Sequence, residues 1–356
     1  MDINVVIIAG GRGTRFWPVS RESRPKQLLN LFEDKPLIES TIQRVLPLIS
    51  TDNIYISTGA DLQPKMMEII GETVQYIIEP VPKDTAAAIG LSAVRLMKDN
   101  NDEDAIMIVL PADHYIKNQD GFLDTIKTGI EFAKQDMLVT IGIKPDFPST
   151  GYGYIRPENT LKEEGIKAWK VGEFFEKPDA KTAEEFIKKG YFWNSGMFIW
   201  KCSVILNEMK KNLPGHYQGL MKIRDAINTE NEFNVIEEVF NEFEKISIDF
   251  GVMEKSQNSA VIEGAFDWDD VGTWRSYDRH LPKDEQGNVV QGKFFSIDSK
   301  NNIVISEDRV VSTIGISNMI IVDTKDALLI VPKDKAEDVK KLVDKLEQEK
   351  ECKHLI

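Results

Sequence analysis

Five short apolar runs recur along the first 143 residues, and each is rich in β-branched side chains. The runs occupy residues 3–8, 53–58, 74–79, 105–111 and 137–143. Their length and composition are typical of parallel strands that are buried on both faces. Helical patterns separate them, as at residues 84–99 and 121–135, and this alternation indicates βαβ units. The sequence therefore predicts an α/β fold with a doubly wound, Rossmann-like, mostly parallel sheet.

The middle of the chain is less regular. A glycine-rich loop leads into a strand at residues 149–157, and further strands are expected at 167–178 and 191–200. Residues 179–190 read as a capped helix that Gly190 ends. We expect these strands and loops to layer over the parallel sheet and to form one wall of a pocket.

The pattern of polar and apolar residues changes again near residue 282. A polar linker is followed by closely spaced, alternating strands, which predict a compact β unit of stacked turns. A terminal helix follows, with Ala336, Val339, Val343 and Leu346 on one face. We therefore predict a domain over residues 1–283 and a small β unit with its helix over residues 284–356.

Composition limits the partners of the chain. Its 356 residues are 42% hydrophobic, enough for a full core, and 58 acidic against 44 basic residues give a net charge of −14, which disfavours broad nucleic-acid binding. Cys202 and Cys352 are too few for a disulfide framework and are expected to be reduced thiols in a cytoplasmic protein. No signal peptide is expected, and no apolar run approaches the roughly 20 residues that span a bilayer.

Positive charge nevertheless gathers in one glycine-rich segment after the first strand. Residues 10–27 contain a single anion, Glu22, and five cations, which are Arg12, Arg15, Arg21, Arg24 and Lys26. Phe16 stands where the dinucleotide fingerprint needs its third glycine, and the Gly-Lys-Ser/Thr of the P-loop is absent. A solvated basic loop is the plain alternative, but Pro18 and Pro25 stiffen the segment, and arginine forks and lysine bind phosphate. We predict a phosphate site here.

The segment resembles the signature of the sugar-nucleotide pyrophosphorylases, a family of nucleotidyltransferases. The matching positions are Gly11, Gly13, Arg15, Pro18, Pro25 and Lys26. The resemblance continues through LPADH (110–114), FFEKP (174–178), WNSGMF (193–198), SIDFGVMEK (247–255) and FDWDDVGTW (266–274). It covers residues 1–280 well and the remainder loosely. It implies the nucleotidyltransferase fold, with residues 1–283 as the catalytic domain.

Two carboxylates are candidates for a metal site. Asp113 follows a buried strand at the edge where open α/β sheets bind ligands, although it could equally cap a helix. The resemblance favours Asp113 and Asp270 as ligands of Mg²⁺, an ion that prefers oxygen donors. Asp269 is an additional carboxylate next to Asp270. We expect it to cap a helix or to support the metal ligands without binding the metal itself.

A second group of residues is expected at the sugar phosphate. By resemblance, Lys177 neutralises the phosphate and Glu176 accepts hydrogen bonds from sugar hydroxyls, whereas an exposed ion pair is the plain alternative. Asn194 is an amide in an aromatic run and needs a partner, and Gly153 lets the backbone approach the sugar.

The resemblance also assigns the nucleotide. We expect Arg15, Lys26 and Lys177 to be catalytic. The expected nucleotide-binding residues are Gly10, Gly11, Gly13, Thr14, Arg15, Glu79 and Thr85. Glu79 is a candidate for recognising the N–H donors of guanine, and Asp84 or Thr85 lies near a helix N-cap. The four histidines show no metal-ligand spacing.

Trp17, Gln27 and the SIDFGVMEK segment resemble members specific for guanosine and mannose. The implied reaction transfers GMP from GTP to α-D-mannose 1-phosphate. One alternative is transfer to glucose 1-phosphate from UTP or dTTP. A non-catalytic sugar-nucleotide sensor would be expected to lack Lys26, Asp113 or Asp270, and Phe16 disfavours a dehydrogenase. A short left-handed β-helix and a homodimer are implied at the C-terminal end. The chain stops before any fused isomerase domain, so a single activity is expected.

Overall fold

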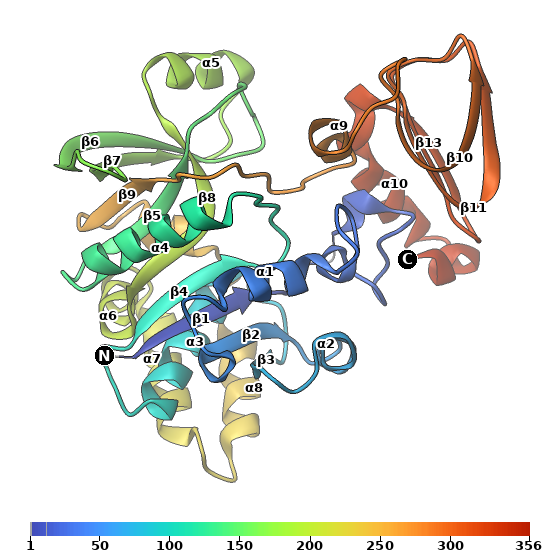
Figure 1. Ribbon diagram of the computed structural model, residues 1–356. Helices are drawn as coiled ribbons and strands as arrows, with labels where there is room; N and C mark the ends of the chain where they lie inside the picture. Colours follow the sequence, from blue (N-terminus) through green and yellow to red (C-terminus); the bar gives the residue numbers. More distant parts are fainter. Residues whose placement is uncertain (1, 12) are drawn as a thin grey trace. The chain divides into compact units, whose positions relative to one another are not determined.

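The computed structural model describes residues 2–11 and 13–356 (Figure 1). The chain forms two compact units. The large unit comprises Met1–Gly10, Thr41–Ala112 and Ile116–Trp268, and the small unit comprises Gly11–Ser40, Asp113–Tyr115 and Asp269–Ile356. The expected glycine-rich segment therefore belongs mostly to the small unit, together with the C-terminal end. The division of the chain into domains 1–283 and 284–356 stays a prediction.

The large unit is built on a nine-stranded sheet with the order β3-β2-β1-β4-β8-β5-β9-β7-β6. Its first four strands are parallel, and they confirm the expected apolar runs. They are β1 (Ile3–Ile8), β2 (Ile54–Gly59), β3 (Gln75–Glu79) and β4 (Ile106–Pro111). The side chains of β1, β2 and β4 are mostly buried on both faces, as their continuous apolar sequence requires.

The middle strands correct one expectation. They do not layer over the sheet but extend it, and β8 (Phe192–Lys201) runs antiparallel between β4 and β5 (Leu138–Ile143). β9 (Ser259–Glu263) continues parallel to β5, and β7 (Ala168–Phe175) and β6 (Tyr154–Lys162) complete the edge. The reason is that β8 is apolar on both faces and pairs its backbone on both sides.

Helices cover both faces of this sheet (Figure 1). On β8, Ile199 meets Gly129 of α4 (Gln119–Ala133), whereas Phe198 and Trp200 pack in the cluster on the opposite face. Alternate strand residues point to opposite faces, so α4 lies opposite that cluster. The cluster includes α3 (Thr85–Asp99), α6 (Cys202–Asn212), α7 (Pro214–Ala226) and α8 (Glu232–Glu242). The remaining large-unit helices are α2 (Gln63–Ile70) and α5 (Ala180–Lys188), while α1 (Leu37–Val45) runs from one unit into the other.

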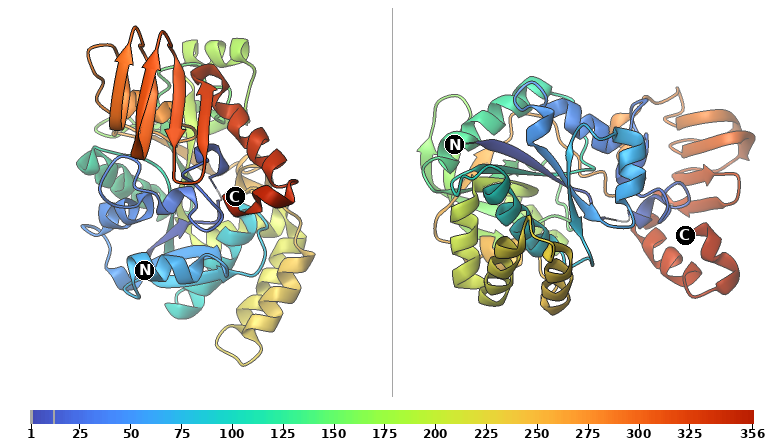
Figure 2. Two further views of the ribbon diagram at one scale, coloured as in Figure 1. Left: turned by 90° about the vertical axis from the view of Figure 1, so that its right-hand side faces the viewer. Right: turned by 90° about the horizontal axis from the view of Figure 1, so that it is seen from below.

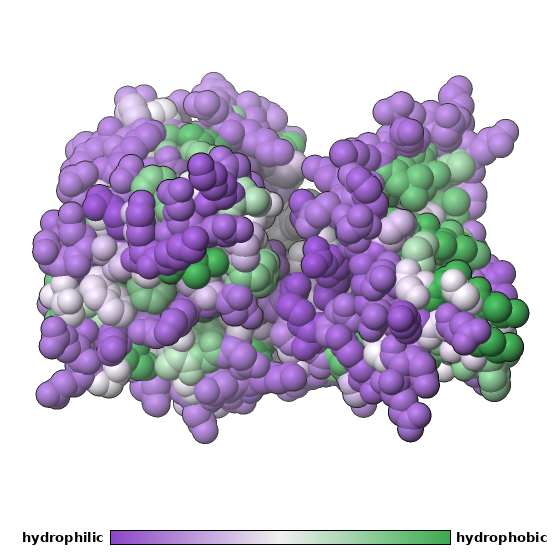
Figure 3. Space-filling view, turned by 90° about the horizontal axis from the view of Figure 1, so that it is seen from above, coloured by the Kyte–Doolittle hydropathy of each residue, from purple (hydrophilic) through white to green (hydrophobic). Residues whose placement is uncertain are grey.

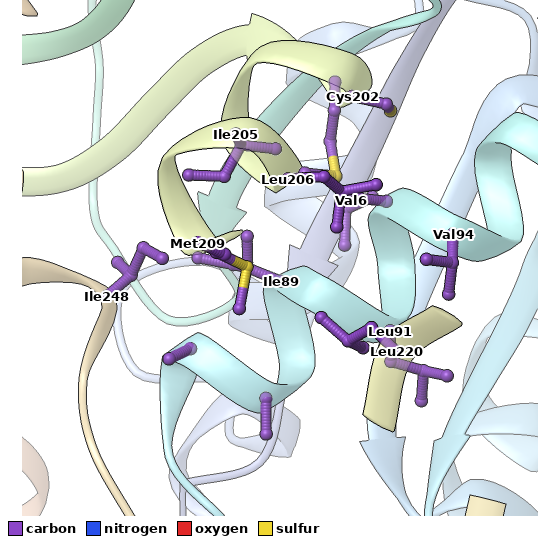
Figure 4. Packing of buried hydrophobic residues seen from close by; sticks show 14 of the residues in the cluster. Val6, Ile89, Leu91, Val94, Cys202, Ile205, Leu206, Met209, Leu220 and Ile248 are labelled. Atoms are coloured by element: carbon purple, nitrogen blue, oxygen red, sulfur yellow. The ribbon is translucent and has the colours of Figure 1, made fainter. Parts of the chain in front are cut away.

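The core of the large unit lies between these helices and the sheet. Figure 4 shows Ile89 and Leu91 of α3 among Leu206 and Met209 of α6 and Leu220 of α7. A Cβ added at Gly90 would lie 2.5 Å from Leu220 Cδ1, so glycine permits the close approach of α3 and α7. Asp84 is the N-cap of α3 and accepts from the Thr85 amide, as expected.

The small unit contains a four-stranded sheet, whose strands stand side by side in orange to red in Figure 2. β10 (Val289–Ile297), β11 (Ile303–Ile314) and β12 (Met319–Asp323) are parallel, and β13 (Leu328–Pro332) is antiparallel to β12. Asn288 and Asn302 are fully buried in successive turns, and Asn288 Oδ1 accepts from the amide of Asn302 at 2.9 Å. These asparagines hold the stacked turns that the sequence predicts.

The end of the chain packs on the glycine-rich segment. Short turns η5 (Lys333–Asp338) and η6 (Lys350–Leu355) flank α10 (Val339–Leu346), and α9 (Arg275–His280) precedes the sheet. Phe16 and Trp17 share one buried cluster with Trp274, Val339 and Val343. Cys202 and Cys352 are free thiols. Across the described residues we find no helix with the length and apolarity that a membrane crossing requires.

Candidate active site

A polar pocket of about 330 Å³ opens within the small unit. The glycine-rich turn, the Asp113 segment, the Asp270 segment and α10 supply its walls. Its lining residues are Gly13, Thr14, Arg15, Phe16, Lys26, Asp113, His114, Asp270, Gly272 and Lys340. The structure thus brings together the expected turn, two of the three expected catalytic cations (Arg15 and Lys26) and both expected metal ligands. Arg12, one of the five cations of the segment, lies outside the described residues.

Gly13 determines how the turn approaches Lys26. Its φ is +62°, a left-handed conformation, and an added Cβ would lie 2.2 Å from Lys26 Cβ. Ser20 Oγ donates to the Gly13 carbonyl at 2.9 Å and holds the turn. Gly10 and Gly11 differ, because a Cβ at either would meet nothing within 4 Å. Only Gly13 is therefore required by packing.

Lys26 is a buried cation with two oxygen partners. Its side chain is 7% exposed, and Nζ lies 2.8 Å from Asp113 Oδ2 and donates to the Asp270 carbonyl at 2.6 Å. Burial opposes ionisation of Asp113, but the charges of Lys26 and His114 outweigh it, and the pKa of Asp113 is lowered. Asp113 is therefore an ionised carboxylate at neutral pH.

The adjacent aspartates have separate tasks. Asp269 is 3% exposed, and its carboxylate is enclosed by four partners: Val271 N, Ser276 Oγ, Arg279 Nε and His280 Nε2 at 2.7, 3.1, 2.6 and 2.6 Å. Burial raises the pKa of Asp269, but these hydrogen bonds and the Arg279 charge reverse the shift and hold the pKa well below its usual range. Asp270 lines the pocket, and Gly272 N donates to its Oδ1 at 3.1 Å. Asp269 supports the loop, and Asp270 faces the site.

Two other cations of the glycine-rich segment, Arg15 and Arg21, also have different positions. Arg15 lines the pocket, and its Nε lies 2.9 Å from Glu337 Oε2. Arg21 instead pairs with Asp326 at 2.8 Å, donates to the Leu355 carbonyl and lies over the Trp17 ring. Arg15 and Lys26 thus line the pocket although each is paired, whereas Arg21 holds the end of the chain.

The expected sugar residues gather in the large unit. A Cβ at Gly153 would lie 2.8 Å from Glu176 Oε2 and 3.5 Å from Asn194 Cβ, so these three residues are adjacent. Asn194 Nδ2 donates to Asp249 Oδ1 at 2.7 Å, and Asn194 Oδ1 accepts from Thr140 Oγ1 at 3.2 Å. The amide thereby gains the partners that the sequence analysis required of it.

Asp249 is a member of this group that the sequence analysis missed. It begins the π-helical turn Asp249–Met253, a form common at functional sites. Burial raises the pKa of Asp249 to about 6, the Asn194 hydrogen bond opposes the shift, and the charge of Glu176 adds to it. The only sequence signal was its place in SIDFGVMEK, as an acid between apolar neighbours.

Lys177 and the nucleotide candidates of the large unit are also placed. Lys177 has a φ of +43°, and its exposed ammonium pairs with Glu176. Glu79 is buried at the end of β3 and accepts from Ser57 Oγ at 3.0 Å. Burial raises the pKa of Glu79 to about 7 against the Ser57 hydrogen bond. Thr85 Oγ1 accepts from the Ile248 amide at 2.9 Å, so this hydroxyl holds the segment that leads to Asp249.

A Rossmann-like sheet together with a pocket of cations and carboxylates defines a class of enzyme that handles nucleoside phosphates. Residues 4–287 match the Nucleotidyl transferase family, and residues 292–346 match the MannoseP isomerase/GMP-like beta-helix domain. A mannose-1-phosphate guanylyltransferase of Salmonella muenchen is 39% identical over 98% of this chain and 74% of the relative. Another, from Escherichia coli K12, is 34% identical over 99% of this chain and 75% of the relative.

Two solved structures are also similar to this chain. A Thermus thermophilus protein, described as a mannose-1-phosphate geranyltransferase, is 35% identical with a TM-score of 0.88, over 98% of this chain and all of that one. A Helicobacter pylori protein described as a mannose-6-phosphate isomerase is 28% identical with a TM-score of 0.61, over 76% of this chain and all of that one. The chain belongs to the nucleotidyl transferase family and, within it, to the mannose-1-phosphate guanylyltransferases.

Proposed function

We propose that this chain transfers GMP from GTP to α-D-mannose 1-phosphate and releases pyrophosphate. The observation that carries the proposal is the position of Lys26, whose ammonium joins the Asp113 carboxylate and the Asp270 carbonyl in the polar pocket. Cations and carboxylates together suit a metal-bound triphosphate. The choice of guanosine and mannose rests on the names of the relatives.

The proposed reaction depends on neutralising the negative charge of the phosphates more than on proton transfer. An oxygen of the sugar phosphate is already anionic when it attacks the α-phosphorus, so no general base is required. The difficulty is to hold two polyanions together in line. In this proposal Arg15, Lys26 and the turn from Gly10 to Thr14 bind the triphosphate and stabilise the charge that builds on the departing pyrophosphate.

Asp113 and Asp270 fit a magnesium ion by their chemistry. Both carry oxygen donors into the pocket, and the described residues contain no group of three or more His, Cys, Asp or Glu that would form a complete metal cage. Mg²⁺ is commonly held by one or two carboxylates, with waters and substrate phosphates as its other ligands. When bound, Mg²⁺ supplies positive charge to the phosphate oxygens.

The large unit supplies recognition of the acceptor and the base. We assign the sugar hydroxyls to Glu176, Asn194 and Asp249, beside Gly153, and the acceptor phosphate to Lys177. Glu79 is assigned to the guanine N–H donors, because its ionised carboxylate accepts two of them. Thr85 supports this nucleotide site through the α3 N-terminus.

The chain is also proposed to act as a homodimer in the cytoplasm, where nucleoside triphosphates are available. Hydrophobic residues gather over the small unit's sheet, on the right of Figure 3. The most exposed of them are Phe295, Ile297, Val310, Ile314, Leu328 and Ile330, at 53–73% exposure. A contiguous apolar face on a regular sheet suits a second copy of itself.

A pyrophosphate-release assay across nucleoside triphosphates and sugar 1-phosphates tests the proposed reaction. We expect clear preference for GTP with mannose 1-phosphate and no release in metal-free buffer. A preference for UTP or dTTP with glucose 1-phosphate would overturn the substrate assignment. Turnover that persists with a chelator would remove magnesium, Asp113 and Asp270 from the mechanism.

A further inference from the structure

We infer that Lys340 of α10 binds the phosphate chain of the nucleotide, so that the C-terminal helix is part of the binding site. The inference deepens the proposed function and rests on it. Lys340 belongs to the terminal helix that the sequence predicts, and the structure places it in the pocket wall with Arg15, Lys26 and Asp113.

Packing determines the place of Lys340. The adjacent Val339 is 2% exposed and shares a buried cluster with Phe16, which belongs to the phosphate-binding turn η1 (Thr14–Phe16). Ala336 and Val343 flank it in the same cluster. The contact of α10 with η1 therefore fixes the first turn of the helix, where Lys340 reaches the pocket while remaining exposed.

Charge distinguishes Lys340 from the two other pocket cations. Lys26 is paired with Asp113, and Arg15 is paired with Glu337. In the described part of the chain, the Lys340 ammonium takes part in no ion pair and no hydrogen bond. An arriving phosphate has no existing ion pair to displace at Lys340, whereas at the other two positions it must share the cation with a carboxylate.

The pairing of Glu337 with Arg15 supports the same conclusion. Glu337 lies in η5, three residues before Lys340, and holds the Arg15 guanidinium at 2.9 Å. The C-terminal segment thus contacts the phosphate-binding turn twice, once through this ion pair and once through the cluster around Phe16. Lys340 adds a direct contact with the ligand.

The test compares Lys340→Ala with Lys345→Ala, a matched loss of one exposed lysine from the same helix outside the pocket wall. Calorimetry with inorganic pyrophosphate and Mg²⁺ measures binding without turnover. We expect about tenfold weaker binding for Lys340→Ala, typical of one charge-assisted contact, little change for Lys345→Ala and partial recovery in Lys340→Arg. In turnover, KM for GTP should rise while KM for mannose 1-phosphate stays constant.

The inference is overturned if Lys340→Ala binds pyrophosphate within twofold of the wild type, or if the wild type does not bind it. Equal losses in Lys340→Ala and Lys345→Ala would also overturn it, because they would indicate general electrostatics. If the wild type binds pyrophosphate through Lys340 but makes no GDP-mannose, the proposed function fails while the inference stands. Thermal melting of each variant checks that the fold is intact.

Discussion

Lys26 and Asp113 form a 2.8 Å ion pair that joins the glycine-rich segment to the turn after β4. Glycine at position 13 makes the pair possible, because any Cβ there would collide with Lys26. The pair also keeps Asp113 ionised against the cost of its surroundings. The same ion pair therefore holds in place both a pocket cation, Lys26, and a candidate metal ligand, Asp113.

Lys26→Met should lower kcat by about 10²–10³ while the chain stays folded, since the substitution removes charge from the transition state but keeps the apolar stem. Asp113 loses its partner but is one-third exposed, so the free energy of unfolding should fall by only about 1 kcal/mol. Steady-state kinetics and thermal melting measure the two effects. Arg24→Ala, an exposed charge loss in the same segment outside the pocket, is the control. Near-wild-type kcat in folded Lys26→Met protein contradicts the role.

Asp270→Asn and Asp269→Asn should separate activity from stability. The first should keep the melting temperature, lower kcat by about 10²–10³ and raise the Mg²⁺ concentration at half-maximal rate. The second should lower the free energy of unfolding by about 3 kcal/mol, because a buried carboxylate with charged partners becomes neutral. The reverse pattern in the two variants would exchange the assignments.

Acid titration adds a further check on Asp269. Its pKa is depressed in the folded state, so the stability it contributes is present above the unfolded pKa of about 4 and is lost as the pH falls below that value. Asp269→Asn should flatten the loss of stability below pH 4. If the free energy of unfolding falls just as steeply below pH 4 in Asp269→Asn, the Asp269 carboxylate does not contribute to stability through its lowered pKa.

Much of this site follows from sequence patterns, and the rest depends on tertiary packing. The parallel strands follow from apolar periodicity, and the cations after the first strand are visible as local charge. The pairing of Lys26 with Asp113 is seen only in the structure. The antiparallel direction of β8 does not, because a strand buried on both faces looks the same in either direction. Lys340 resembles every other polar position of an amphipathic helix until Val339 is seen to pack on Phe16. In the sequence, only the resemblance distinguishes Asp270 from Asp269, and the structure adds the four partners that enclose the Asp269 carboxylate.

Asp249→Asn should raise the free energy of unfolding and weaken the binding of mannose 1-phosphate. The folded pKa of Asp249 is about 6, above the unfolded value of about 4, so the carboxyl costs stability increasingly as the pH rises from 4 through 6. The amide removes that cost and still accepts from Asn194, so the free energy of unfolding at pH 7 should rise by up to about 2.5 kcal/mol. KM for mannose 1-phosphate should rise as well. Denaturant titrations at pH 4.5 and pH 7 provide the check: a gain equal at both values would contradict the titration argument.

Glu79→Gln should reduce preference for GTP. In the proposed function the ionised carboxylate accepts two guanine N–H groups, so its loss should lower kcat/KM for GTP about tenfold to a hundredfold and leave other triphosphates nearly unchanged. Because the pKa of Glu79 is about 7, affinity for GDP-mannose should weaken as the pH falls below 7. The diphosphate of GDP-mannose carries no proton that titrates in this range. Glu79→Gln should abolish the pH dependence, and an identical profile in the variant would exclude Glu79.

Ile314→Lys should convert the proposed dimer to monomers. Ile314 is 73% exposed on the apolar sheet face and lies outside the polar pocket of the small unit. A two-fold interface contains each substitution twice, so losing two apolar contacts of about 1.5 kcal/mol each weakens the dimer by at least about a hundredfold. Analytical ultracentrifugation measures the shift, with Phe233→Lys on α8 as the control for an equally exposed apolar residue elsewhere. Wild-type protein that stays monomeric at high concentration would show that this sheet face does not pair two copies. A dimer that survives Ile314→Lys would place the interface on another surface.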